Sequence, residues 1–154
     1  MVKFENSIHI KRPVEEVFSF LADFENIPRW NYYVLEVKKL SPGSAGLGSL
    51  YHQVRKTDEQ DFRISEYELN HRVAVKTEPG NSPMLEMRFI LQPDGEGTTL
   101  KDQWELETGR PTILEKLSVG RVKAAVAENL GKLKELLEEG HAHLQDGRVT
   151  RKDT

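Results

Sequence analysis

The sequence predicts one α+β domain in which a seven-stranded antiparallel sheet curves around a long C-terminal helix. Three observations support this prediction. An alternating segment opens the chain and two short helical patterns follow it, six further segments alternate apolar and polar residues, and the last long segment has a helical period. Short connections rich in Gly, Pro, Asn and Asp join the alternating segments, which favours an antiparallel meander.

The long helix is predicted over residues 112–139, where apolar side chains recur at intervals of three and four. These residues are Val119, Val122, Val126, Leu130, Leu133 and Leu137. Gly140 follows, at a position where glycine commonly ends a helix. Gly120 and Gly131 each mark a bend, a close approach to the backbone or simply a tolerated glycine. At ~1.5 Å per residue the helix is roughly 40 Å long, so it must lie across an equally broad apolar surface.

The N-terminal segments predict a strand followed by an elbow of two short helices. Residues 3–11 alternate in polarity, which is typical of a half-buried strand, and Asn6 is the one polar residue on its apolar side. A short amphipathic helix begins at Pro13. A second helical segment covers residues 24–30, and Pro28 keeps it brief.

The six later segments with a period of two are predicted to complete the sheet. They are Tyr32–Leu40, Gly48–Thr57, Asp61–Leu69, Val73–Glu78, Met84–Gln92 and Thr98–Glu107. In two of these segments the pattern does not decide which residues face the core. In the second, either Tyr51 or His52 can face the core; in the third, Phe62 and Tyr67 lie on opposite parities. A β-bulge near Ser65 would reconcile that conflict.

Composition limits the functional classes. With 154 residues, 37% of them hydrophobic, the chain fits one domain, expected over residues 1–140, with a polar and flexible tail over residues 141–154. A net charge of −3 without a long basic run argues against nucleic-acid binding. No apolar run reaches the ~18 residues of a membrane span, so we expect a soluble, cytoplasmic protein without stable membrane insertion. The oligomeric state is left open.

No sequence motif indicates a cofactor or a metal site. The absence of cysteine excludes disulfides, thiol catalysis and cysteine-ligated metals. His141 and His143 are two residues apart, but no carboxylate-rich segment surrounds them, so we predict no metal. The sequence also shows no catalytic triad and no phosphate-binding loop.

The last predicted strand carries one charged residue on its apolar side, because Asp102 lies between Leu100 and Trp104 in the alternation. A carboxylate there is desolvated, and its pKa rises unless a partner compensates. In one interpretation Asp102 binds a structural partner, such as a tyrosine hydroxyl or a basic group. In another it faces a cavity, where it is the single weak candidate for catalysis. If His52 faced inward beside it, the two could form a proton-transfer pair.

Four segments together resemble the START-like (SRPBCC) superfamily, which includes Bet v 1-type allergens, the polyketide cyclase/dehydrase family and lipid-transfer domains. They are IHIKRPVEEVFSFLADFENIPRW, LGSLYHQV, EGTTLKDQWELE and the long terminal helix. The opening segment matches best, with Pro13, Asp23, Pro28 and Trp30 in the expected order. The resemblance implies a helix-grip fold, β-α-α-β6-α, around a deep apolar pocket.

The resemblance implies binding of a hydrophobic or amphipathic small molecule, lipid, polyketide-like or aromatic, by a carrier or sequestering protein. One alternative is an aromatase/cyclase-type enzyme acting on a polyketide-like substrate, which two facing ionisable groups would favour. The other is a protein-interaction module, which a filled core with an exposed apolar patch would favour. Met87 and Phe89 are equally suited to a cavity wall and to an ordinary core. The residues expected to bind the ligand are Trp30, Tyr51, Val75, Met87, Phe89, Asp102, Trp104, Val119, Val122 and Val126.

Overall fold

The computed structural model describes residues 2–81, 84–107 and 112–153, and it confirms the predicted α+β helix-grip architecture. The strands of the main sheet are β1 (Val2–Ile10), β2 (Val34–Lys39), β3 (Leu50–Arg55), β4 (Glu59–Glu68), β5 (Arg72–Thr77), β6 (Met84–Asp94) and β7 (Gly97–Glu107). The helices are α1 (Val14–Ala22), the 3-10 helix η1 (Phe24–Arg29) and α2 (Thr112–Glu139). The two short helices therefore follow the first strand, as predicted.

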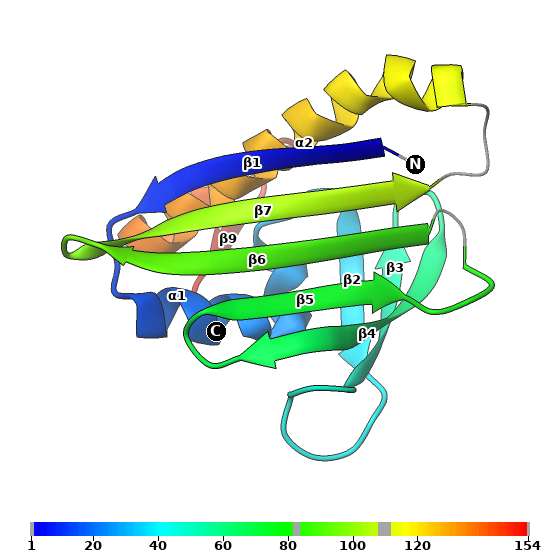
Figure 1. Cartoon of the computed structure of the whole chain (residues 1–154). Helices are drawn as coiled ribbons and strands as arrows, with labels where there is room; N and C mark the ends of the chain where they lie inside the picture. Colours follow the sequence, from blue (N-terminus) through cyan, green and yellow to red (C-terminus); the bar gives the residue numbers. More distant parts are fainter. Residues whose placement is uncertain (1, 82–83, 108–111, 154) are drawn as a thin grey trace.

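The sheet is a meander whose first strand returns to pair with its last. Its strand order is β1-β7-β6-β5-β4-β3-β2, and every neighbouring pair is antiparallel. In Figure 1, β1, β7, β6 and β5 run alongside one another, whereas β2 and β3 lie behind them in a clearly different direction. This curl forms the concave side of the sheet, and α2 lies across that side next to β1.

A β-bulge at Ser65 gives β4 two inward parities, as the sequence suggested. The pairing of β4 with β5 shifts register between Ile64 and Glu66, so that Ser65 is the extra residue. Before the bulge Phe62 is buried, and after it Tyr67 packs against the core. A single inserted residue is what allows positions five apart to share one face.

The inward residue of β3 is Tyr51, which is buried and stacks on Phe62 of β4. His52 therefore points to the outer face, where its Nδ1 lies 2.6 Å from Oδ1 of Asp61. That hydrogen bond raises the pKa of His52. The suggested proton-transfer pair between His52 and Asp102 is wrong, because the two side chains lie on opposite faces of the sheet.

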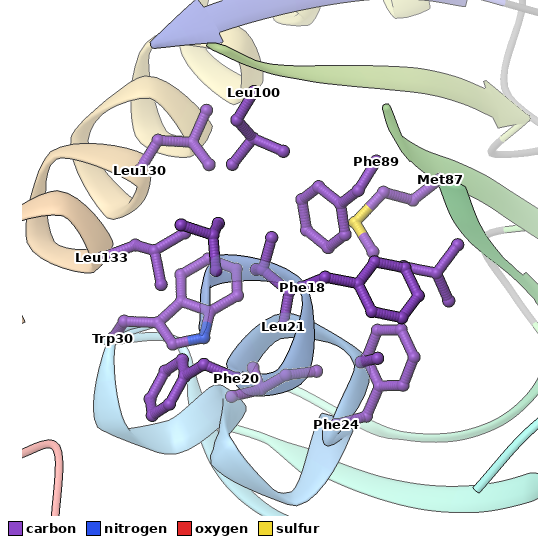
Figure 2. Packing of buried hydrophobic residues seen from close by; sticks show 14 of the residues in the cluster. Phe18, Phe20, Leu21, Phe24, Trp30, Met87, Phe89, Leu100, Leu130 and Leu133 are labelled. Atoms are coloured by element: carbon purple, nitrogen blue, oxygen red, sulfur yellow. The ribbon is translucent and has the colours of Figure 1, made fainter. Parts of the chain in front are cut away.

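The closed part of the core forms where the C-terminal half of α2 meets the sheet and the two short helices. Leu130, Leu133, Leu136 and Leu137 of α2 are all within 2% of complete burial. Figure 2 shows leucines of α2 together with aromatic and aliphatic side chains of α1, η1, β6 and β7 in this region. The two short helices thus pack against one end of the curved sheet and close it.

One glycine follows the end of α2, and two others lie inside this continuous helix. Gly140 has a φ of +83°, and its N–H donates to the carbonyl of Leu136, which is the geometry of a helix C-terminus. A Cβ on Gly120 or Gly131 would meet no atom within 4 Å. Both are tolerated glycines rather than sites of close approach.

The structure gives residues 141–153 a regular element where the sequence predicted a polar, flexible tail over residues 141–154. The chain instead forms a two-stranded hairpin of β8 (His141–His143) and β9 (Val149–Arg151). Ala142 is fully buried and Leu144 nearly so. These two buried residues in a mostly polar segment are too few to create a periodic signal, yet they bring the hairpin against α2.

Hydrogen bonds also attach this hairpin to the end of η1. The Nη1 group of Arg29 donates to the carbonyl of Lys152 over 2.5 Å, and the hydroxyl of Thr150 donates to the carbonyl of Arg29 over 2.6 Å. These partners are more than one hundred residues apart in the sequence. Local sequence patterns carry no information on such a contact.

Candidate functional site

A cavity of about 240 Å³ lies between the middle of α2, the helix η1 and strands β2 to β7. The cavity begins where the closed core ends. Along α2, the inward side chains first line the cavity and then, from Leu130 onward, pack in the core. Most of its described lining is apolar. These residues are Ile27, Trp30, Tyr33, Val34, Phe62, Val75, Leu85, Met87, Trp104, Val122, Ala125 and Val126.

Polar side chains form the rest of the lining, and several of them are buried. They are Asn31, Gln53, Arg55, Gln60, Thr77, Asp102 and Asn129. The Thr77 hydroxyl accepts a hydrogen bond from the backbone N–H of Leu85 over 2.9 Å. The Oδ1 atom of Asn129 accepts one from Nε2 of Gln145 over 3.3 Å. These bonds fix the polar groups in place, which a site for a specific ligand requires.

The guanidinium group of Arg55 is bound by a neighbouring carboxylate. Its Nε and Nη2 atoms donate to the two oxygens of Asp58 over 2.7 Å and 2.6 Å. This bidentate contact lowers the pKa of Asp58. The positive charge in the cavity wall is therefore already balanced.

Asp102 faces the cavity from β7, as its place in the alternation predicted, and is 1% exposed. Its Oδ1 accepts a hydrogen bond of 3.0 Å from the indole N–H of Trp104, two residues further along the strand. The partner is therefore neither a tyrosine nor a basic group. Burial raises the pKa of Asp102 to about 7, and the bond from Trp104 opposes that shift. Such a carboxyl group can exchange a proton near neutral pH.

The indole of Trp104 is held in place from β1. Its ring stacks on that of Phe4, with the centroids 5.4 Å apart and the planes 20° from parallel. Stacking on one side and the hydrogen bond to Asp102 on the other restrict the rotation of Trp104. The acid and the indole therefore form one ordered unit in the cavity wall.

Residues 1–138 match the model of a protein family described as "Polyketide cyclase / dehydrase and lipid transport". The chain belongs to this family. Its C-terminal hairpin lies beyond the matched region. A comparison with curated proteins found no match. Among the described helices, none combines the length and apolar composition that crossing a membrane requires.

Solved structures show that this family member shares its fold with distant bacterial proteins. A START superfamily protein from Mycobacterium smegmatis has a TM-score of 0.72 at 18% identity, covering 88% of this chain and 98% of its own. A protein from Mesorhizobium loti has a TM-score of 0.70 at 18% identity, covering 90% and 98%. A protein from Thermus thermophilus has a TM-score of 0.64 at 19% identity, covering 90% and 95%.

In this polyketide cyclase/dehydrase and lipid-transport family member, most of the side chains expected at the site meet in the cavity. Together they come from the residue that follows η1, from three strands and from α2. They are Trp30, Val75, Met87, Asp102, Trp104, Val122 and Val126.

Three other expected residues lie outside the described lining. Tyr51 packs between Phe24 and Phe62 and borders a shallow hollow near α1 instead. Phe89 is fully buried in the core, with its ring against that of Trp30. Val119 is half-buried, one turn before the first α2 residue that reaches the cavity.

Several lining residues were missed, although the sequence held a signal for some of them. Asn129 lies three residues after Val126 and so shares the apolar face of α2. Thr77 lies two residues after Val75, and Gln60 two residues before Phe62, on the same faces of their strands. The signal that identified Asp102, a polar residue on an inward face, applies equally to Asn129 and Thr77, whereas Gln60 lay just outside the predicted strand Asp61–Leu69.

Proposed function

We propose that this protein binds a small hydrophobic or amphipathic molecule, lipid-like, polyketide-like or aromatic, in the cavity between α2 and the sheet, as a carrier or sequestering protein. The observation that carries the proposal is an apolar cavity with a few fixed polar groups in its wall. The family description, which includes lipid transport, supports it. The proposal includes the cytoplasmic location expected from the sequence.

The size of the cavity favours a compact ligand. Its volume of about 240 Å³ is slightly below the roughly 300–1,000 Å³ typical of small-molecule sites. A fused-ring compound, or the end of a longer chain, suits such a space. The exposed side chain of Tyr33 in the lining indicates that one side of the cavity reaches solvent.

An uncharged fluorescent probe tests the proposal. N-phenylnaphthylamine fluoresces more strongly in apolar surroundings, and we expect it to bind with a dissociation constant of micromolar order, about −8 kcal/mol. Ala125→Trp should weaken binding at least about tenfold, because Ala125 lines the cavity and an indole would fill it. Fluorescence titration measures both values.

Ala124→Trp is the matched control, since Ala124 is the preceding residue of α2, is exposed and is not part of the described lining. We expect it to bind the probe as the parent does. Circular dichroism should show the same helix content in all three proteins. Equal binding by parent and Ala125→Trp would place the probe elsewhere and contradict the proposal.

A second candidate function is catalysis of the aromatase/cyclase kind, favoured by one observation. A carboxyl group whose pKa is raised to about 7 suits a general acid or base. A carrier function remains the first proposal, because catalysis of this kind is favoured by two facing ionisable groups. Arg55, another ionisable group of the lining, is already bound by Asp58. Turnover of a polyketide-like substrate that disappears in Asp102→Asn, with probe binding retained, would reverse this order.

A further inference from the structure

Asp102 places a negative charge inside the cavity, and none of the described residues gives it a positive partner. Asp102 is the one acidic side chain of the described lining, and the hydrogen bond found at its carboxylate comes from the neutral indole of Trp104. An ionised carboxylate has about four acceptor positions, so most of its capacity stays open. Burying such a group without a counter-charge is unfavourable.

The cation of the lining does not supply that counter-charge. Arg55 lies on β3, whereas Asp102 lies on β7, and β4, β5 and β6 separate these strands in the sheet. Both oxygens of Asp58 bind Arg55 instead. A buried carboxylate with a structural role is normally paired, and no ion pair joins Asp102 to a cation among the described residues.

The surroundings of Asp102 suit an ammonium group attached to an apolar body. Trp104 and Trp30 both line the cavity, and indole is the aromatic ring that attracts cations most strongly. Val75, Met87 and Val126 provide apolar walls for the remainder of a ligand. In low-dielectric surroundings a charged pair is bound more strongly than a neutral hydrogen bond.

We propose that the cavity takes an amine with a compact apolar body, whose ammonium group pairs with the Asp102 carboxylate beside the indole of Trp104. This inference rests on the binding function proposed above and names the chemical class of its ligand. Burial of the apolar body stabilises the complex, and the ammonium group provides the positive charge that no described lining residue provides to Asp102.

Three competitors of similar shape measure the contribution of the amine apart from that of the apolar body. Naphthylmethylamine, naphthalenemethanol and methylnaphthalene, all substituted at the same ring position, are compared as competitors of bound N-phenylnaphthylamine. At about pH 8 the carboxylate is ionised and the alkylamine is still protonated. We expect the amine to displace the probe at a concentration at least about tenfold lower than the alcohol or the hydrocarbon.

Asp102→Asn removes the charge while keeping the size of the side chain and one acceptor oxygen. We expect this variant to lose the preference for the amine, so that the three competitors displace the probe at similar concentrations. Asp153→Asn is the matched control, because Asp153 is exposed and lies outside the described lining. It should keep the full preference for the amine.

The pH profile of the parent gives a second measurement, independent of whether the variant folds. Protonation of Asp102 removes its charge, so the advantage of the amine should be lost as the pH falls from about 8 to about 5, whereas hydrocarbon binding should not change. The residues paired with Asp102 across the sheet are Asn6 of β1 and Phe89 of β6, and neither titrates. The other ionisable side chains of the described lining are Tyr33, which precedes β2, and Arg55 of β3.

The outcomes distinguish this inference from the proposed function. Equal displacement by all three competitors, or an alcohol as effective as the amine, overturns the amine and leaves the apolar site in place. A preference that persists in Asp102→Asn assigns the charge to another residue and overturns it as well. Absence of probe binding in the parent overturns both proposals.

Discussion

The two halves of α2 face the same sheet but pack against it differently. From Leu130 onward the inward residues are leucines, and Leu130, Leu133 and Leu136 are at most 1% exposed. Before Leu130 the inward residues are smaller or polar, and Val122 and Ala125 remain half-buried beside the cavity. One half of the helix closes the core, and the other forms a wall.

Side-chain size explains much of this difference. Leucine reaches further from the helix than alanine or valine, so leucines fill more of the space between helix and sheet than the smaller residues do. The filled half buries the larger apolar side chains of α2, so it contributes more hydrophobic stabilisation than the half beside the cavity. The side chains that fill the core and those that line the cavity therefore lie on different turns of one helix.

The largest expected effect comes from truncating a leucine in the filled half. Leu133 is fully buried, so Leu133→Ala should lower the free energy of unfolding by about 2–5 kcal/mol. Leu85→Ala is the matched change at the cavity, where Leu85 is half-buried and faces existing space. It should cost less than half as much. Urea denaturation of the two variants measures both values, and equal costs would show that the two regions are packed alike.

A smaller effect, dependent on pH, should distinguish the cavity half. An unfolded aspartate titrates near 3.9, whereas burial raises the pKa of Asp102 in the folded protein to about 7. The folded protein thus holds the proton more tightly, and Asp102 destabilises it progressively as the pH rises from about 4 to about 7. The free energy of unfolding of Asp102→Asn should match that of the parent near pH 4. Above about pH 7 the variant should be more stable by a few kcal/mol.

Urea denaturation at the two ends of that pH range measures the difference. Asp153→Asn, which removes an exposed carboxylate, should show no such dependence on pH. A loss of stability in Asp102→Asn at the higher pH would mean that the ionised carboxylate has a structural partner. In that case the cavity half would resemble the closed half more than its geometry indicates.

The smallest expected effect concerns the glycine in each half of α2. Gly120 and Gly131 both face open space, so replacing either by alanine should stabilise the protein by up to about 1 kcal/mol. Thermal unfolding of Gly120→Ala and Gly131→Ala measures the two gains. A gain at Gly131 alone would indicate that the first half of α2 is less regularly helical in solution than the second.

Strict alternation and helical spacing made most of the fold predictable. The predicted bounds of α2 match the structure, and the seven strands differ from their predictions by a few residues at their ends. The same patterns placed Asp102 and Trp104 on the inward face of β7. Each of these results depends on which side of an element a residue occupies, which is local information.

The extent of the cavity along a strand could not be predicted in this way. Met87 and Phe89 share one face of β6, yet Met87 lines the cavity and Phe89 lies in the closed core against Trp30. The boundary between them is set by η1, which packs on the sheet from a distant part of the sequence. Alternation identifies the face of a residue, whereas its depth depends on what lies opposite.

Hydrogen bonds connect the C-terminal hairpin to residues at the cavity. It holds Arg29, the residue before cavity-lining Trp30, and Gln145 in its loop holds Asn129, another lining residue. A pulling force applied at the C-terminus would therefore load two walls of the cavity before it reached the sheet. A ligand that binds both walls would act as a crosslink, and the force needed to detach the hairpin would rise with its occupancy.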